Sequence, residues 1–413
     1  MLAALFGPYL DMVVVPDGGY SLPLPGMANL SATSLYGYAL GGSALLVFLV
    51  SPILGAIADH AHYKKRFLIV FCATGSISTF AMGWIGPGDV ELALILFGMA
   101  NFSFVSANVF YDAFLPHIAA PDEQDQVSGR GYAWGYAGGG VLFVLQLLLI
   151  QFHESIGMES AALAVRVCLA SAGLWWGGFS LITCSRLAEP RREHLGLTII
   201  GHVARGMQRL ATTMHHVRSM PNIMLFLFAF MIYNDGIQTT IAMATIYGSD
   251  ELGFDTLTLM GCLLMVQFVG IVGSRTFTTV AHRIGTKPTV LVTLGIWSLV
   301  VLYAYFMTEP WEFWVLGAIV GLVLGGSQAL SRSLFSQIIP AAASAEFFGF
   351  FSVFEKFSAI GGPIIFAVMR QLTGSARLAI LSLLVLFVTG IILLVKVNME
   401  RARHEGASLK AHL

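Results

Sequence analysis

A charged connection separates two apolar runs near the start of the chain. The stretch SPILGAIADHAHYKKRFLIV, residues 51–70, holds Asp59 and then three consecutive cations that begin at Lys64. An Asp at a helix end can pair with a cation or accept N–H groups from another helix N-terminus, and Gly55 permits a close helix approach. We therefore expect Gly55, Asp59 and Lys64 to form a latch. The alternative is that the cations only anchor the loop beside lipid headgroups.

A second group of polar residues lies deep inside an apolar run, in the stretch YNDGIQTT. Ionisable groups at such a depth are costly and tend to line a cavity or pair with one another. We expect Asp235 and Gln238 to bind an ammonium group or a coupling proton. Asn234 and Gly236 beside them suggest a local helix break that frees backbone groups. The alternative is an Asp that caps a kink.

A third set of polar side chains lies in the run around residue 108. Asn108 and Tyr111 are spaced i,i+3, so they share one helical face and are expected to line a cavity. Asp112 lies near the end of that run and is expected to pair with Arg130 at the start of the next one. These contacts would join two neighbouring helices.

Two later runs carry further charges. Gln328 and Arg332 are spaced i,i+4 on one face, and the guanidinium of Arg332 suits a carboxylate ligand. Glu355 and Lys356 are adjacent, so they point about 100° apart and at most one faces a central path squarely. Arg332 and Glu355 lie at matching depth on sequential helices, which predicts an ion pair between them.

Membrane-spanning helices must position these groups. The chain has 413 residues, of which 56% are hydrophobic and only 11% charged, against about 25% charged in soluble domains. Helices of about 20 apolar residues cross a bilayer. The apolar segments predict twelve such helices, approximately at residues 1–15, 34–58, 67–86, 92–115, 128–152, 162–185, 221–247, 256–280, 287–307, 311–339, 345–370 and 376–397.

Alternate connections differ in charge, which predicts the orientation. Lys and Arg gather in the connection that contains Lys64, in residues 186–220 and in the tail, whereas the opposite connections carry Asp and Glu. Positive residues remain cytoplasmic, so the basic connections and the C-terminus are expected in the cytoplasm. The predicted organisation is a six-helix half (1–185), a linker with an amphipathic helix (186–220), a second six-helix half (221–397) and a tail (398–413).

The two halves resemble each other in sequence. In each half, the fourth helix ends in an apolar pair and a Pro (Pro116 and Pro340), and an aromatic-rich helix with a glycine cluster follows. Such a duplication is typical of transporters whose halves rock about a central site. The connection AHRIGTK, residues 281–287, echoes the first charged connection, with His282 where the first half has Asp59. We expect a weaker and pH-sensitive latch there.

The charged connection follows the G-x-x-x-D-(R/K)-x-G-(R/K)-(R/K) pattern of major facilitator superfamily transporters. The stretches FYDAFLPHIA, YNDGIQTTIAMATIYGSDELG and AEFFGFFSVFEKFSAIGGP resemble the vacuole-effluxer branch, which contains autophagy-linked vacuolar amino-acid exporters and bacterial permeases. The resemblance implies a twelve-helix fold and export of amino acids or similar small solutes. A coupling proton or sodium ion and a monomer are expected. The compact loops and the Ala/Gly/Leu-rich composition favour a bacterial inner membrane over a fungal vacuole.

Several other functions are excluded or kept as alternatives. The formal charge of −1 and the lack of a large basic patch give no reason to expect nucleic acid binding, and no nucleotide-binding or catalytic motif indicates an enzyme. The cysteines lack metal-ligand spacing. The pairs His60/His62 and His215/His216 could bind a metal, but no Cys or acidic cluster accompanies them, so no metal or cofactor is expected. An exporter of a larger amphiphile and a membrane binding protein without transport activity remain as alternatives.

The first segment is unusually short. Residues 1–15 would span about 22 Å as a helix, which is less than the hydrocarbon thickness. We therefore expect the first helix to be incomplete at its cytoplasmic end, or the natural protein to begin upstream.

Overall fold

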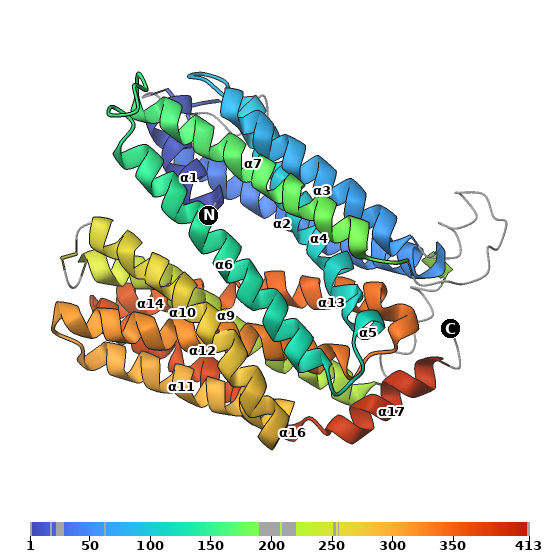
Figure 1. The fold of residues 1–413 in the computed structure, drawn as a ribbon. Coiled ribbons are helices and arrows are strands. Elements are labelled where there is room, and N and C mark those ends of the chain that lie inside the picture. The colour runs from blue at the N-terminus through green and yellow to red at the C-terminus, as the bar shows by residue number, and fades with distance from the viewer. Residues whose placement is uncertain are drawn as a thin grey trace.

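The structure is a computed structural model that describes residues 2–16, 19–21, 29–61, 63–189, 207–208, 220–250, 253–254 and 256–410. Its regular elements are almost entirely helices, which arrange in two bundles (Figure 1). The first bundle, drawn from blue to green, contains the elements up to α7. The second bundle, drawn from yellow to red, contains α9 to α16, and α6 of the first bundle leans across the seam onto α10 and α12.

The first bundle follows the predicted order of apolar segments. Its elements are α1 (Leu2–Tyr9), the π-helix η1 (Leu10–Val14), α2 (Ala32–Ala61), α3 (Lys64–Ala81), η2 (Met82–Trp84), α4 (Val90–Ala113), α5 (Leu115–Ile118), α6 (Gln124–Gln151) and α7 (Ala161–Arg186). The first segment packs its buried face against α2 and α7.

The second bundle repeats this layout. Its elements are α9 (Pro221–Asp250), α10 (Thr256–Ile284), α11 (Thr286–Phe306), α12 (Pro310–Ser336), η4 (Ala341–Ala343), α13 (Ser344–Phe357), α14 (Gly361–Thr373), α15 (Ala376–Ser382), α16 (Leu384–Lys396) and α17 (Met399–Lys410). The twelve predicted segments therefore all appear as helices. The predicted linker helix falls almost wholly outside the described residues, and the predicted bounds of the halves stay a prediction.

The helices suit a bilayer in length and composition. Among the described residues, ten helical stretches are long and apolar enough to cross a membrane. A helix satisfies its own backbone hydrogen bonds, which a lipid environment requires. Many large apolar side chains point outward, including Leu181, Leu372 and Ile77, as expected for surfaces that contact lipid.

The eleventh segment is broken, whereas the seventh is not. The chain turns at residues 358–360, between α13 and α14, near the middle of the membrane span. The predicted break around Asn234 and Gly236 was wrong, because α9 runs unbroken from Pro221 to Asp250. Gly236 instead gives room to the ring of Phe387, whose atoms lie about 3 Å from where a β-carbon would stand.

Candidate functional site

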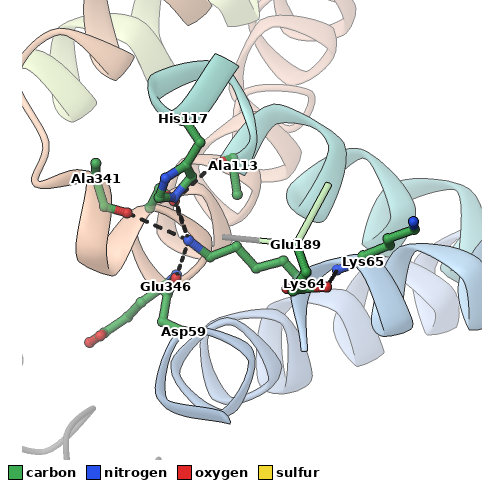
Figure 2. A network of polar contacts seen from close by, with 9 residues as sticks. Asp59, Lys64, Lys65, Ala113, His117, Glu189, Ala341 and Glu346 are labelled. Atoms are coloured by element: carbon green, nitrogen blue, oxygen red, sulfur yellow. Dashed lines mark hydrogen bonds and ion pairs between the residues drawn. The ribbon is translucent and has the colours of Figure 1, made fainter. Parts of the chain in front are cut away.

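The charged connection forms a buried cluster around Asp59 and Lys64 (Figure 2). We call the end of the two bundles where this cluster lies the basic face. Lys64 is the first residue of α3, and Asp59 lies in the last turn of α2. The Lys64 Nζ lies 2.7 Å from Asp59 Oδ1, with both side chains almost fully buried. The ammonium also donates to Ser344 Oγ and His117 Nε2, each at 2.8 Å. Lys64 therefore connects the first bundle to α13 of the second.

The second oxygen of Asp59 holds the start of α13. Asp59 Oδ2 accepts the backbone N–H of Glu346, the third residue of that helix, at 2.8 Å. The first N–H groups of a helix have no partner within the helix and carry partial positive charge, so a carboxylate there is favourable. Asp59 thus meets a cation and a helix N-terminus at once. These are the two kinds of partner that its position in the sequence suggested.

Gly55 makes this contact possible. A β-carbon on Gly55 would stand 2.3 Å from the carbonyl oxygen of Ala345 and 2.8 Å from Cα of Glu346. Because both neighbours are backbone atoms, a side chain could not fit without separating α2 from α13. The glycine lets the end of α2 approach the start of α13 closely enough for Asp59 to reach the Glu346 N–H.

The matching crossing in the second half, between α10 and α6, uses different residues. His282 lies in the last turn of α10 and is exposed, so the structure does not bring it into this contact. The carboxylate here is Asp125, in the first turn of α6. Its Oδ2 accepts from Thr286 Oγ1 at 2.7 Å, and its Oδ1 accepts from Ser333 and Gln337. The run of acids Asp122, Glu123 and Asp125 in a basic connection was the signal that could have identified it.

Arg332 also joins the two bundles, about one helical turn farther from the basic face than the Asp125 contacts. Its Nη1 donates to Asp112 Oδ1 at 2.8 Å, while Nε and Nη2 donate to the hydroxyl and the carbonyl of Ser128, each at 3.0 Å. The guanidinium also lies over the ring of Tyr132, 4.5 Å from its centre. Every one of these partners belongs to α4 or α6, across the seam.

Two predicted ion pairs were therefore wrong. Arg332 pairs with Asp112 and, within the described part of the chain, makes no ion pair with Glu355. Asp112 likewise does not pair with Arg130, which is exposed. Similar depth alone does not say which way a side chain points. The side of α12 that carries Arg332 faces α4 and α6 rather than α13.

Two polar residues of α9 form hydrogen bonds at the break between α13 and α14. Asp235 Oδ2 accepts the N–H of Gly362, at the start of α14, at 2.8 Å, and Asn234 Nδ2 donates to Ser358 Oγ within the break. Thr239 donates to the other oxygen of Asp235. These contacts favour the alternative that was kept open for Asp235, an Asp that caps a kink, although the kink belongs to the neighbouring helix.

The remaining predicted residues fall into two groups. Gln328 accepts a hydrogen bond from Tyr136 of α6 at 2.6 Å, which adds to the seam. The side chains of the others form no hydrogen bond or ion pair within the described residues, and none of them is fully buried. Tyr111 contacts Arg332 only with its ring face. The residues in this second group are Asn108, Tyr111, Gln238, Glu355 and Lys356.

A further carboxylate lies at the edge of the basic face. Glu189, just beyond α7, accepts the backbone N–H of Lys65 in the first turn of α3 at 2.9 Å (Figure 2). Burial raises the pKa of Glu189, although the hydrogen bonds from Lys65 and Lys64 and the charges of Lys64 and Arg66 act in the opposite direction. Glu189, like Asp59 and Asp235, is therefore a carboxylate that accepts a backbone N–H at a helix start.

Known proteins resemble this chain over nearly its whole length. Residues 22–407 match the family described as vacuole effluxer Atg22-like. An uncharacterized MFS-type transporter, YxiO of Bacillus subtilis, is 34% identical over 91% of this chain and 87% of its own. Autophagy-related protein 22-1 of Penicillium rubens is 24% identical over 97% of this chain and 81% of its own.

Solved structures show the same fold at low identity. The transporter FucP in an outward conformation matches 96% of this chain and 94% of its own, with a TM-score of 0.70 and 12% identity. The proton:xylose symporter XylE with bound 6-bromo-6-deoxy-D-glucose matches 96% and 91%, with a TM-score of 0.69 and 15% identity. The chain thus belongs to the Atg22-like family of the major facilitator superfamily and is a multi-pass membrane transporter rather than an enzyme.

Proposed function

We propose that this transporter exports small zwitterionic solutes, amino acids first, by alternating access. The observation that carries the proposal is the adjacent pair Glu355 and Lys356, which are half-buried and whose side chains lack hydrogen-bond and ion-pair partners within the described residues. They lie in the last turn of α13, directly before the break in the eleventh helix. Breaks of this kind at mid-membrane are typical of substrate sites in transporters.

Opposite charges on adjacent residues suit a zwitterion. Neighbours on a helix diverge by about 100°, so Glu355 and Lys356 do not neutralise each other well. A carboxylate and an ammonium of the cargo can each take one of them. Asn108 and Tyr111 on α4, with Gln238 on α9, would add hydrogen bonds, because their polar groups have no partner of their own.

The seam on the basic face would act as the gate. The Asp59, Asp125 and Arg332 contacts all join the two bundles there, so access from that face requires these contacts to break. By the distribution of basic residues the face is cytoplasmic. A gate closed at the cytoplasm corresponds to the outward-facing state. The family's description as vacuole effluxers supports export as the direction.

Transport in proteoliposomes tests the proposal. We expect purified protein to exchange labelled amino acids against unlabelled ones, and expect Lys356→Gln to weaken exchange about tenfold or more, since it loses a charge-assisted bond. Asn101, whose side chain already bonds Ser43, provides the control: Asn101→Ser should leave the half-saturation concentration near that of the unaltered protein. Exchange that is absent for all amino acids, or equal in Lys356→Gln, would overturn the proposal.

A second candidate cargo is a larger amphiphile. An apolar groove of about 320 Å³ lies where α2, α9 and α13 meet. It is lined by Phe48, Leu227, Met231, Phe347, Phe350 and Phe354, together with further apolar residues. Its chemistry fits an acyl chain or an aromatic cation. Competition by such compounds in the exchange assay, without any competition by amino acids, would favour this alternative.

A further inference from the structure

We infer that Arg130 and Arg275 form a binding site for the phosphate of an anionic phospholipid, on the outer side of the crossing between α6 and α10. The site is separate from the gate contacts and does not depend on the cargo. Both side chains are exposed, and among the residues that the structure describes neither guanidinium has a hydrogen bond or an ion pair. The two arginines belong to opposite bundles, so one headgroup would contact both.

A close contact between the two helices brings these arginines to neighbouring points. A β-carbon on Gly129 of α6 would stand 3.0 Å from the carbonyl oxygen of Ser274 in α10. Arg130 follows Gly129 and Arg275 follows Ser274, so each arginine begins one residue away from this contact. Figure 1 shows α6 leaning across α10. The two backbones therefore meet at the level of the pair.

The order of contacts along α6 directs Arg130 outward. Ser128 donates to the carbonyl oxygen of Ala329 in α12, and the next residue, Gly129, meets α10. Each residue turns a helix by about 100°, so Arg130 points past α10 on the side away from α12.

The same order along α10 directs Arg275 to that side. Gly273 packs on the backbone of Leu322 in α12, and the next residue, Ser274, meets α6. Arg275 comes third and therefore also points away from α12. Because α6 begins at the basic face and α10 ends there, the two helices turn in opposite senses when viewed from that face. The third residue of each series thus lies on one shared outer surface.

The surface around the pair suits lipid. Trp134, one turn after Arg130, is 73% exposed, and Val272, about one turn before Arg275, is 57% exposed. At 1.5 Å per residue, the two arginines lie about 9–14 Å inside the ends of their helices at the basic face. An unpaired guanidinium at this depth is costly, and its long side chain can extend toward the headgroups. A ligand with negative charge is therefore favoured there.

A phospholipid phosphate supplies the missing partner. Its charged oxygens can accept paired hydrogen bonds from a planar guanidinium, and the cytoplasmic leaflet is rich in anionic lipids. Nearby acids compete little: Asp125 is already bonded within the seam, and Glu123 begins about 10 Å before Arg130 along α6. His282 and Arg283, exposed in the last turn of α10, continue the positive stripe toward the basic face.

Lipid binding to the purified protein tests the inference. In native mass spectrometry, we expect the parent protein to bind one dioleoyl-phosphatidylglycerol more tightly than dioleoyl-phosphatidylcholine, which has the same chains but no net charge. The double variant Arg130→Gln/Arg275→Gln should bind phosphatidylglycerol about thirtyfold more weakly, because each arginine near an anionic lipid contributes roughly fivefold. Each single variant should lose part of this affinity.

Two further variants make the result specific. Arg186→Gln/Arg401→Gln removes two exposed cations at the last turn of α7 and in α17, and this matched control should bind like the parent. Arg130→Lys/Arg275→Lys keeps both charges without the planar groups and should recover part of the affinity. Phosphatidylglycerol should raise the melting temperature of the parent and of the control, but not that of Arg130→Gln/Arg275→Gln.

Three binding results would overturn the inference. They are equal affinity of the parent and Arg130→Gln/Arg275→Gln for phosphatidylglycerol, equal affinity of the parent for the two lipids, and equal stabilisation of the parent by inorganic phosphate alone. A melting temperature of the double variant far below that of the parent, without lipid, would also contradict it, because the two side chains would then support the fold. None of these measurements involves amino-acid exchange.

Discussion

The two crossings on the basic face share a geometry but differ in charge. At the first, between α2 and α13, a buried carboxylate meets a buried ammonium and a helix N-terminus. At the second, where α6 crosses α10, the Asp125 carboxylate accepts from two hydroxyls and an amide at the start of α11 and the end of α12, and the described residues give it no cation. Both crossings depend on a glycine: a β-carbon on Gly129 would stand 2.4 Å from the Thr278 methyl group, as one on Gly55 would meet Ala345.

The difference separates two properties of a gate. Hydrogen bonds from neutral donors to a carboxylate hold a contact with about 1.5–3 kcal/mol each, and their donors exchange readily to water. A buried ion pair is all-or-none, because either partner left alone is costly. We propose that the first crossing, where the buried Asp59–Lys64 pair bonds the start of α13, holds the basic face closed more strongly than the Asp125 contacts, which mainly align the bundles.

Removal of the first carboxylate should have the largest effect. Asp59→Ala leaves the Lys64 ammonium buried with only neutral partners, which should disfavour the closed state by about 3–5 kcal/mol. We expect a lower melting temperature in detergent and a protein that favours the open basic face. The double variant Asp59→Ala/Lys64→Met should regain part of the stability, and a double variant less stable than Asp59→Ala would contradict the ion-pair account.

A methyl group at Gly55 should have the next largest effect. Gly55→Ala should cost about 1–3 kcal/mol in the closed state, because its β-carbon meets backbone that cannot move alone. Gly41→Ala is the matched control in the same helix, since no atom lies within 4 Å of its added β-carbon. Thermal unfolding of both variants checks this. Equal melting temperatures would show that α2 and α13 do not need the close approach.

Loss of the Asp235 carboxylate, which caps α14 within the second bundle, should destabilise the protein less than a methyl group at Gly55 does. Asp235→Ala removes the acceptor for the Gly362 N–H, which should destabilise the protein by about 0.5–2 kcal/mol. Asp235→Asn keeps an acceptor and should remain close to the parent protein in stability. If Asp235→Asn abolishes amino-acid exchange while it leaves the melting temperature unchanged, Asp235 acts in transport as well as in the fold.

The smallest expected effect is on how stability depends on pH, and it concerns Glu189 at the edge of the first crossing. The pKa of Glu189 is raised in the folded protein, so the folded state binds its proton more tightly than the unfolded state does. Its contribution to stability is therefore full below the unfolded pKa, about 4.3, and is lost as the pH rises through the raised value. Glu189→Gln should flatten this part of the curve of melting temperature against pH. An identical slope in both proteins would argue against the shift.

The sequence predicted the helices and the first latch because both rest on local patterns. Long apolar runs set the helices, and Asp59 with Lys64 lies in one short connection whose residues must meet. The spacing of Asn108 and Tyr111 placed them on one face for the same reason. Such inferences need only the period of the helix and the length of a loop.

Contacts between distant helices were harder to predict. Depth placed Arg332 beside Glu355, but the rotation of α12 about its axis directs the guanidinium to Asp112. The break was assigned to α9 because Asn and Gly occur there, while it lies in the eleventh helix beside Gly361 and Gly362. In the second half, the residue that makes the latch contacts is Asp125 of α6 rather than the expected His282 of α10. These outcomes depend on packing between helices, which periodicity within one helix does not encode.

One measurement tests the central claim most directly: the separation of spin labels at Arg186→Cys and Arg283→Cys, at one pH, in Asp59→Asn and in Asp125→Asn. Both substitutions remove one negative charge and keep the size of the side chain. We predict that Asp59→Asn shifts a large fraction of the protein to the wider separation, while Asp125→Asn stays close to the parent distribution. Equal shifts in the two variants, or a larger shift in Asp125→Asn, would contradict the claim that the charged crossing holds the basic face closed.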